Sequence, residues 1–112
     1  MNDLPIILKT HALYPRIIKI SANLPTLEKQ TLGRRTEDAV LNLLEYLIMA
    51  KNAGKALKTP YLIKSTALAE ILQFHLRTYL EQNLANPTTL HQLQVELIEI
   101  QRQLGGWLKS TK

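Results

Sequence analysis

The sequence has 112 residues, of which 46% are hydrophobic, and we expect residues 1–112 to form one domain with its own core. It contains no cysteine, which excludes disulfides and thiolate metal sites and favours the reducing cytoplasm. The 14 lysines and arginines exceed the 9 acidic residues, and the formal charge of +5 favours acidic partners such as nucleic acid. No apolar run reaches the roughly 18 residues of a membrane span, so no membrane association is expected. The first residues lack the basic segment of a secretory signal, so we expect the protein to begin near Met1.

Apolar residues recur at intervals of three and four, which predicts helices. The first helix should cover about residues 4–23, with Asp3 as a possible N-cap, and Pro15 should kink it because proline removes one backbone donor. We expect His11 to face the core as a hydrogen-bonded histidine and not as a catalytic base. The helix carries two apolar stripes, which are Leu4, Ile7, His11, Tyr14 and Ile18, and then Ile6, Leu13, Ile17, Ile20 and Leu24.

Residues 23–26 should form a turn, because a residue before proline avoids the α region. The second helix should then cover about 27–53, with Gly54 placed to end it in a left-handed conformation. The third should cover about 60–83, with Pro60 in its first turn. The expected core positions of these two helices are Val40, Leu43, Leu47, Ala50, Leu62, Ala69, Leu72, Leu76 and Tyr79.

The fourth helix should cover about 88–110, with Thr89–Gln92 as a possible capping box. Its apolar seam is formed by Leu90, Leu93, Leu97, Ile100, Leu104 and Leu108. Four helices of about 20 residues with short links predict an all-α fold, an up-down-up-down antiparallel four-helix bundle roughly 30 Å long.

The helices carry more apolar surface than one core stripe each requires. The first helix has two stripes, and Leu41, Leu68 and Ile71 widen the apolar faces of the second and third. Scattered exposed aliphatic side chains are normal in monomers, whereas a contiguous surplus indicates a subunit interface. We therefore expect self-association.

The basic residues should gather at one end of the bundle. Residues 51–64 hold four lysines and no acid, and this topology places them near both termini, with Arg34 and Arg35 at the opposite end. A surface of this kind would bind phosphates without sequence preference and weaken steeply with salt. The alternative is that each charge only aids solubility or complements a helix dipole. The candidate residues for binding nucleic acid or a partner are Lys9, Arg16, Lys19, Arg34, Arg35, Lys51, Lys55, Lys58, Lys64, Arg77, Arg102 and Lys109. We expect Lys112 to lie at the same end of the bundle as the lysines of residues 51–64.

No motif for catalysis is found. The three histidines, His11, His75 and His91, lie on separate helices without the spacing of metal ligands. No glycine-rich phosphate loop or nucleophile motif occurs, and Glu99 is spaced to pair with Arg102. Phe74, with Tyr79 and Trp107, is expected in the core and not as a stacking platform for bases. We predict that the protein is not an enzyme and that it binds no metal and no cofactor.

Three stretches carry a resemblance that covers nearly the whole chain. They are Leu13-Tyr14-Pro15 with Leu24-Pro25, then Thr31-Leu32-Gly33-Arg34-Arg35, and finally Leu104-Gly105-Gly106-Trp107-Leu108. The chain resembles the four-helix-bundle family encoded by intervening sequences in bacterial large-subunit ribosomal RNA genes. It is more closely similar to relatives of that family, the accessory variability determinant proteins of diversity-generating retroelements. Gly105 and Gly106 cost about 1 kcal/mol each in a helix, so we expect them to let a neighbouring backbone approach beside Trp107.

The retroelement resemblance implies a ring-shaped homopentamer with a basic surface. Such proteins bind the reverse transcriptase of the retroelement together with RNA or DNA, and they support mutagenic copying of template RNA without catalysis. Arg77 lies in a stretch similar to a basic-aromatic stretch of the phage members, although Gln73 stands where an arginine would strengthen the match. The ribosomal branch implies the alternative, a structural or interaction protein with a protein partner and no nucleic-acid role.

Overall fold

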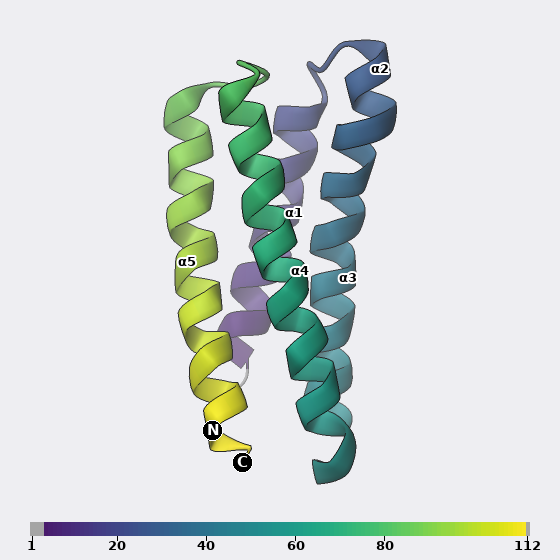
Figure 1. Ribbon diagram of the computed structural model, residues 1–112, viewed down its shortest axis with the longest axis vertical. Helices are drawn as coiled ribbons and strands as arrows, with labels where there is room; N and C mark the ends of the chain where they lie inside the picture. The colour runs from purple at the N-terminus through teal and green to yellow at the C-terminus, as the bar shows by residue number, and fades with distance from the viewer. Residues whose placement is uncertain (1–3, 112) are drawn as a thin grey trace.

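Four long helical rods pack side by side in the computed structural model, which describes residues 4–111 (Figure 1). The described residues contain no strand. The elements are α1 (Leu4–Ser21), α2 (Thr26–Glu28), the π-helical segment η1 (Lys29–Gly33), α3 (Arg34–Asn52), α4 (Lys55–Glu81) and α5 (Pro87–Ser110). Because α2, η1 and α3 follow one another without a break, they form a single rod, and the predicted all-α four-helix bundle is confirmed.

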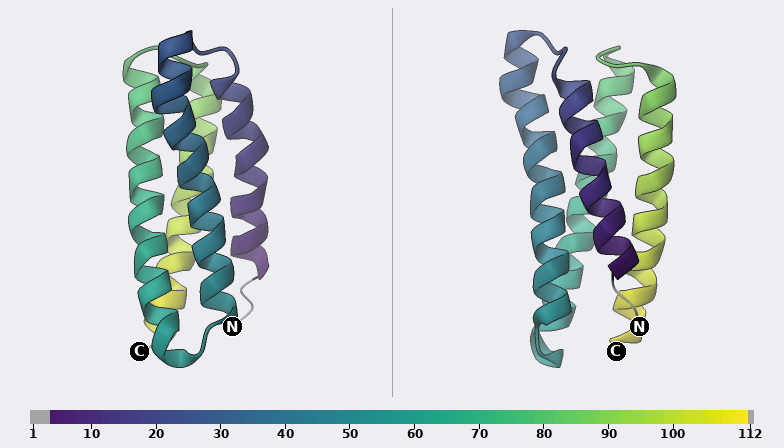
Figure 2. Two further views of the ribbon diagram at one scale, coloured as in Figure 1. Left: turned by 90° about the vertical axis from the view of Figure 1, so that its right-hand side faces the viewer. Right: turned by 180° about the vertical axis from the view of Figure 1, so that it is seen from behind.

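Successive rods run in opposite directions, so both ends of the described chain lie at the same end of the bundle as the α3–α4 turn (Figures 1 and 2). The α1–α2 and α4–α5 turns lie at the other end. Each rod packs against two neighbours: α4 lies against α3 and α5, and α1 lies against the same two helices. The bundle extends 44 Å along its longest axis. It is longer than predicted because α4 has 27 residues.

One stripe of each rod fills the core. On α1 the second predicted stripe, which includes Leu13 and Ile17, is buried, whereas the first stripe is half-buried or exposed where the structure describes its side chains. His11 is exposed, so its predicted place in the core is wrong. The core positions predicted on the other helices are confirmed with two exceptions: Phe74 is exposed, and Leu108 is only half-buried, so that Trp107 takes the place at the end of the seam.

Two helix starts differ from the prediction. Helix α4 begins at Lys55, five residues early, and Pro60 lies inside it and not in its first turn. Gly54 is extended, with φ −67°, and its carbonyl accepts hydrogen bonds from the amides of Leu57 and Lys58, so it starts α4 and does not end α3 in a left-handed conformation. The left-handed residue is Asn83 with φ 54°, after the end of α4.

The predicted capping box at Thr89–Gln92 of α5 is also wrong. Asn86 is the N-cap, and its side-chain oxygen accepts from the amides of Thr88 at 2.9 Å and Thr89 at 3.2 Å. Helix α1 ends at Ser21, two residues before the predicted limit, and Pro15 lies exposed within it. The possible N-cap Asp3 lies outside the described residues. No helix in the described part of the chain has the length and apolar character needed to cross a membrane.

The π-helical segment η1 changes the helical geometry of the α2–η1–α3 rod where this rod meets the end of α1. Gly33 is buried there, and a Cβ atom at this position would lie 3.0 Å from Cδ1 of the buried Leu24. A glycine therefore allows η1 to pack closely against the α1–α2 turn. The π turn is closed by the amide of Arg34, which donates to the carbonyl of Lys29, five residues earlier.

Candidate nucleic-acid interface

The lysines around the α3–α4 turn form the strongest candidate interface. We call Lys51, Lys55, Lys58, Lys64 and Lys109 the basic end. The hydroxyl groups of Thr59 and Thr111 lie 3.1 Å apart, which places the last turn of α5 beside the first turns of α4. No ion pair joins these lysines to an acidic residue within residues 4–111. The predicted gathering of lysines at this end is therefore present in the fold.

Helix dipoles explain only some of these lysines. Lys51 and Lys109 lie in the last turns of α3 and α5, where a positive charge is favourable. Lys55 and Lys58 lie at the start of α4, where the dipole is positive and no acidic residue compensates. The N-cap Gly54 offers no side-chain oxygen, so amide groups at this helix start are left to water or to an anion. These features together disfavour a cation and favour a phosphate.

Lys64 contacts the aromatic ring of Tyr46. Its ammonium group lies 5.3 Å from the centre of the Tyr46 ring, and the Tyr46 and Tyr61 ring centres are 6.2 Å apart. A cation–π contact keeps the charge and limits the motion of the side chain. Lys64 therefore extends the basic end from the α3–α4 turn along α4.

Two of the candidate arginines are instead paired with carboxylates. Arg16 binds Glu96 at 2.6 Å, and Arg102 binds both oxygens of Glu99 at 2.6 and 2.8 Å. The second pair, which the spacing predicted, holds the pKa of the Glu99 carboxyl down to about 2. Arg77 is largely exposed and lies 3.6 Å from Glu81, which is a loose contact. Arg16 and Arg102 can therefore bind a phosphate only beside a carboxylate.

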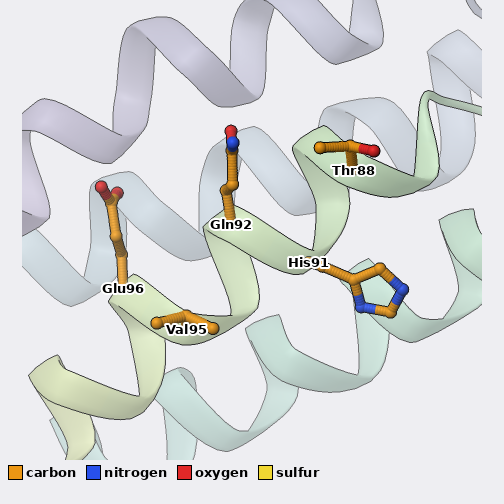
Figure 3. Close-up of a pocket in the computed structure, with 5 residues that line it drawn as sticks. All are labelled: Thr88, His91, Gln92, Val95 and Glu96. Carbon is orange, nitrogen blue, oxygen red and sulfur yellow. The ribbon is translucent and has the colours of Figure 1, made fainter.

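The Arg16 contact is formed on one side of α5. Gln92 and Glu96 lie one turn apart and point the same way, whereas His91 points away from them (Figure 3). Arg16 reaches Gln92 as well, at 3.5 Å. The five residues labelled in Figure 3 line a surface pocket, and none of them is a lysine or an arginine. This side of α5 is therefore not part of the basic end.

The other α1 lysines are exposed but lie apart from each other. Lys9 lies close enough to Glu99 to help lower the pKa of that carboxyl. Lys19 lies in the last turn of α1, towards the opposite end of the bundle, and complements the helix dipole there. Lys9 and Lys19 therefore do not form one cluster.

Arg34 and Arg35 start α3 at the opposite end of the bundle, as predicted. Both line a surface groove with His75 from α4 and with Gln30 and Asn42, which the sequence reasoning did not select. The signal in the sequence that could have found Gln30 and Asn42 is their helical spacing from two adjacent arginines. No local pattern could have placed His75 beside them, because His75 lies on another helix.

Gly105 and Gly106 are exposed on α5. A Cβ atom on either would have no atom within 4 Å, so no backbone of the described chain approaches them and that prediction is wrong for the single chain. Trp107 is buried beside them, as predicted. The glycines remain open to a second molecule.

Several large apolar side chains are exposed on neighbouring helices α4 and α5. Phe74 is 58% exposed, which corrects its predicted place in the core, and Val95 is 65% exposed. Ile63 on α4 and Ile98 on α5 are also exposed. We call these four side chains the apolar face. Apolar side chains exposed on two neighbouring helices are suited to a protein–protein contact.

The described residues contain no group of three or more histidine, aspartate or glutamate side chains that could hold a metal ion. Comparison of the chain with family models, with curated proteins and with solved structures finds no match.

Proposed function

We propose that this protein is a non-catalytic accessory protein of a diversity-generating retroelement. In this role it is a cytoplasmic, basic homo-oligomer, a ring-shaped pentamer, that binds the reverse transcriptase and its RNA or cDNA and supports mutagenic reverse transcription and retrohoming. The resemblance of the three sequence stretches supports the choice of system. The basic end supports the binding of nucleic acid.

The observation that carries the nucleic-acid role is the placement of Lys55 and Lys58. Two cations at a helix start oppose the dipole, and the four lysines between Glu45 and Glu70 have no acidic residue among them. A phosphate would relieve this repulsion and accept hydrogen bonds from the free amides of the same turn. Nucleic acid supplies such phosphates in a row, and binding would release counterions.

Assembly supports the same role. Repeating the basic end around a ring would present many cations to one strand, and the affinity gained from several weak contacts exceeds that of any single contact. The apolar face and the open surface at Gly105 and Gly106 are suited to contact with another subunit or with the reverse transcriptase.

Charge reversal tests the nucleic-acid role. We expect Lys55→Glu with Lys58→Glu to weaken binding of a single-stranded RNA by about tenfold or more at low salt, and to reduce the slope of log K against log salt by about 1 or more. Fluorescence anisotropy across a salt series measures both quantities. Arg77→Ala should weaken binding less, because one exposed charge is removed and none is reversed.

The matched control is Lys19→Glu with Lys29→Glu, which changes the net charge equally at the opposite end of the bundle. Equal weakening by both double variants would show that only net charge matters and would contradict the basic end as the contact. Binding by the unmodified protein that ignores salt, or no binding at about 100 mM salt, would remove the nucleic-acid role altogether.

The exposed apolar face favours a second candidate, an interaction protein of the ribosomal intervening-sequence type whose partner is a protein. In that case the lysines serve solubility, and substitution of Phe74 by serine should disrupt partner binding while the charge reversals leave it unchanged. Pull-down with a retroelement reverse transcriptase, in parallel with RNA titration, separates the two functions.

A further inference from the structure

A groove between the α2–η1–α3 rod and α4, in the half of the bundle opposite the basic end, combines groups of three chemical kinds. It has a volume of about 550 Å³, within the usual range for small-molecule sites, and is open to the surface. Arg34 and Arg35 supply positive charge, and Leu68 and Ile71 from α4 supply apolar surface. The remaining polar groups are amides, a carboxylate and an imidazole.

The two arginines have no carboxylate within ion-pair distance among residues 4–111, although Asp38 lines the same groove. Their guanidinium groups are therefore available to an anion, and such groups suit the paired oxygens of a phosphate. The free Asp38 carboxylate is repelled by a bare anion, but it can accept hydrogen bonds from hydroxyl groups such as those of a ribose.

The imidazole of His75 is oriented by the core. The hydroxyl proton of Thr36 is donated to the carbonyl of Leu32 at 2.7 Å, so the Thr36 oxygen accepts from Nδ1 of His75 at 3.2 Å. This leaves Nε2 as the acceptor nitrogen of the ring. Burial, and then the charge of Arg35, lower the pKa of His75, which favours the neutral ring, and Nε2 of that ring can accept an N–H or O–H.

The π-helical segment brings the first wall of the groove into place. Gln30 belongs to η1, and Arg34 closes the π turn by bonding to Lys29. In such a turn residues four and five apart lie on one face, so Gln30, Arg34 and Arg35 line one groove. Single π turns often occur at functional sites.

We propose that this groove binds a ribonucleotide, with its phosphate on Arg34 and Arg35, its ribose hydroxyls on Asp38 and its base over Leu68 and Ile71, within reach of the Gln30 and Asn42 amides and of His75. A bare phosphate would use neither the carboxylate nor the apolar side chains, and an apolar ligand would leave the arginines unpaired. The ligand is either a free mononucleotide or a nucleotide within an RNA strand. The inference extends beyond the proposed function, because a free nucleotide can bind here whether or not the basic end binds a strand.

Adenosine 5′-monophosphate is the first probe, with adenosine, inorganic phosphate and 2′-deoxyadenosine 5′-monophosphate as comparisons. We expect AMP to bind most tightly by calorimetry and to shift the His75 imidazole signals in NMR spectra, because it alone engages every group. Arg34→Gln with Arg35→Gln should weaken AMP binding at least about tenfold. Asp38→Asn should reduce the preference for AMP over its deoxy form. Helical content measured by circular dichroism establishes that each variant is folded.

Arg16→Gln with Arg102→Gln is the matched control, because it removes the same charge outside both the groove and the basic end, and AMP binding should be unchanged by it. If the ligand is a strand nucleotide, AMP will compete with single-stranded RNA and the arginine variant will also lose RNA affinity; if it is a free nucleotide, RNA affinity will stay the same. Absence of AMP binding at millimolar concentration, or equal binding by the arginine variant, overturns the proposal. Neither result depends on whether the basic end binds RNA.

Discussion

Ion pairing separates the basic residues of this chain into two groups. Arg16 and Arg102 contact carboxylates at 2.6 Å, whereas the lysines of the basic end have no such partner among the described residues. An exposed ion pair contributes only about 0–1 kcal/mol, so a phosphate can displace it, but the released carboxylate then repels that phosphate. The lysines are therefore the better phosphate ligands, although an arginine has the better geometry for a phosphate.

The Glu99 carboxyl gives a test at the scale of one residue. Its pKa is lowered to about 2, first by the hydrogen bonds from Arg102, so Arg102→Ala should raise the pKa towards 4.5. A lowered pKa in the folded state means that the pair stabilises the fold above pH 4.5 and that this contribution is lost as the pH falls towards 2. A carboxyl NMR titration measures the shift. If the pKa of Glu99 stays near 2 in the Arg102→Ala variant, a group other than Arg102 stabilises the charged carboxylate.

At the scale of the element, helix starts depend on which side chain meets the first free amides. Asn86 is the N-cap of α5, although Thr89, three residues later, also has a side-chain oxygen that can cap a helix. Pro87 follows it at the first helical position, where a missing amide costs nothing, which favours a helix start at that point. The start of α4 has no side-chain cap, which leaves the amides of Lys55 and Ala56 without a side-chain acceptor.

Removal of the α5 cap should therefore lower the stability of the fold. We expect Asn86→Ala to reduce the free energy of unfolding by about 1 kcal/mol, because two amides lose their acceptor. Asn86→Asp should retain most of that stability, and Thr89→Val, which alters the abandoned capping box, should change it little. Urea denaturation followed by circular dichroism measures all three. A larger loss for Thr89→Val than for Asn86→Ala would contradict this account of the helix start.

At the scale of the whole molecule, the surface has two features that the single chain does not explain. One is the apolar face on α4 and α5, and the other is the adjacent pair Gly105 and Gly106 on the outside of α5. Each glycine weakens the helix by about 1 kcal/mol relative to alanine, and no contact within the described chain offsets that cost. A second subunit packed on this surface would account for both features.

Replacement of both Gly105 and Gly106 by alanine distinguishes the isolated subunit from the assembled protein. The isolated subunit should become more stable, by up to about 2 kcal/mol, because the added methyl groups meet open space. The assembled protein should lose affinity between subunits, because the same methyl groups would stand between two backbones. Thermal unfolding measures the first effect and light scattering the second. A variant that is more stable and keeps its assembly mass would show that the glycines are not at a subunit contact.

The sequence by itself determined the helices, most core positions and the gathering of lysines between Lys51 and Lys64. These properties are local, because helical spacing decides which side chains of one helix share a face and charge composition does not depend on packing. The Glu99–Arg102 pair was predictable for the same reason, since both residues lie on one helix.

Only the tertiary structure decided which stripe of α1 enters the core, which arginines are paired and which groups meet in the Arg34–Arg35 groove. Arg16 and Glu96 are 80 residues apart, and Thr36 and His75 are 39 apart. Such contacts depend on how each helix is rotated and shifted against its neighbours, which the pattern within a single helix does not contain. The same dependence explains why His11 and Phe74, both at apolar spacing, lie at the surface.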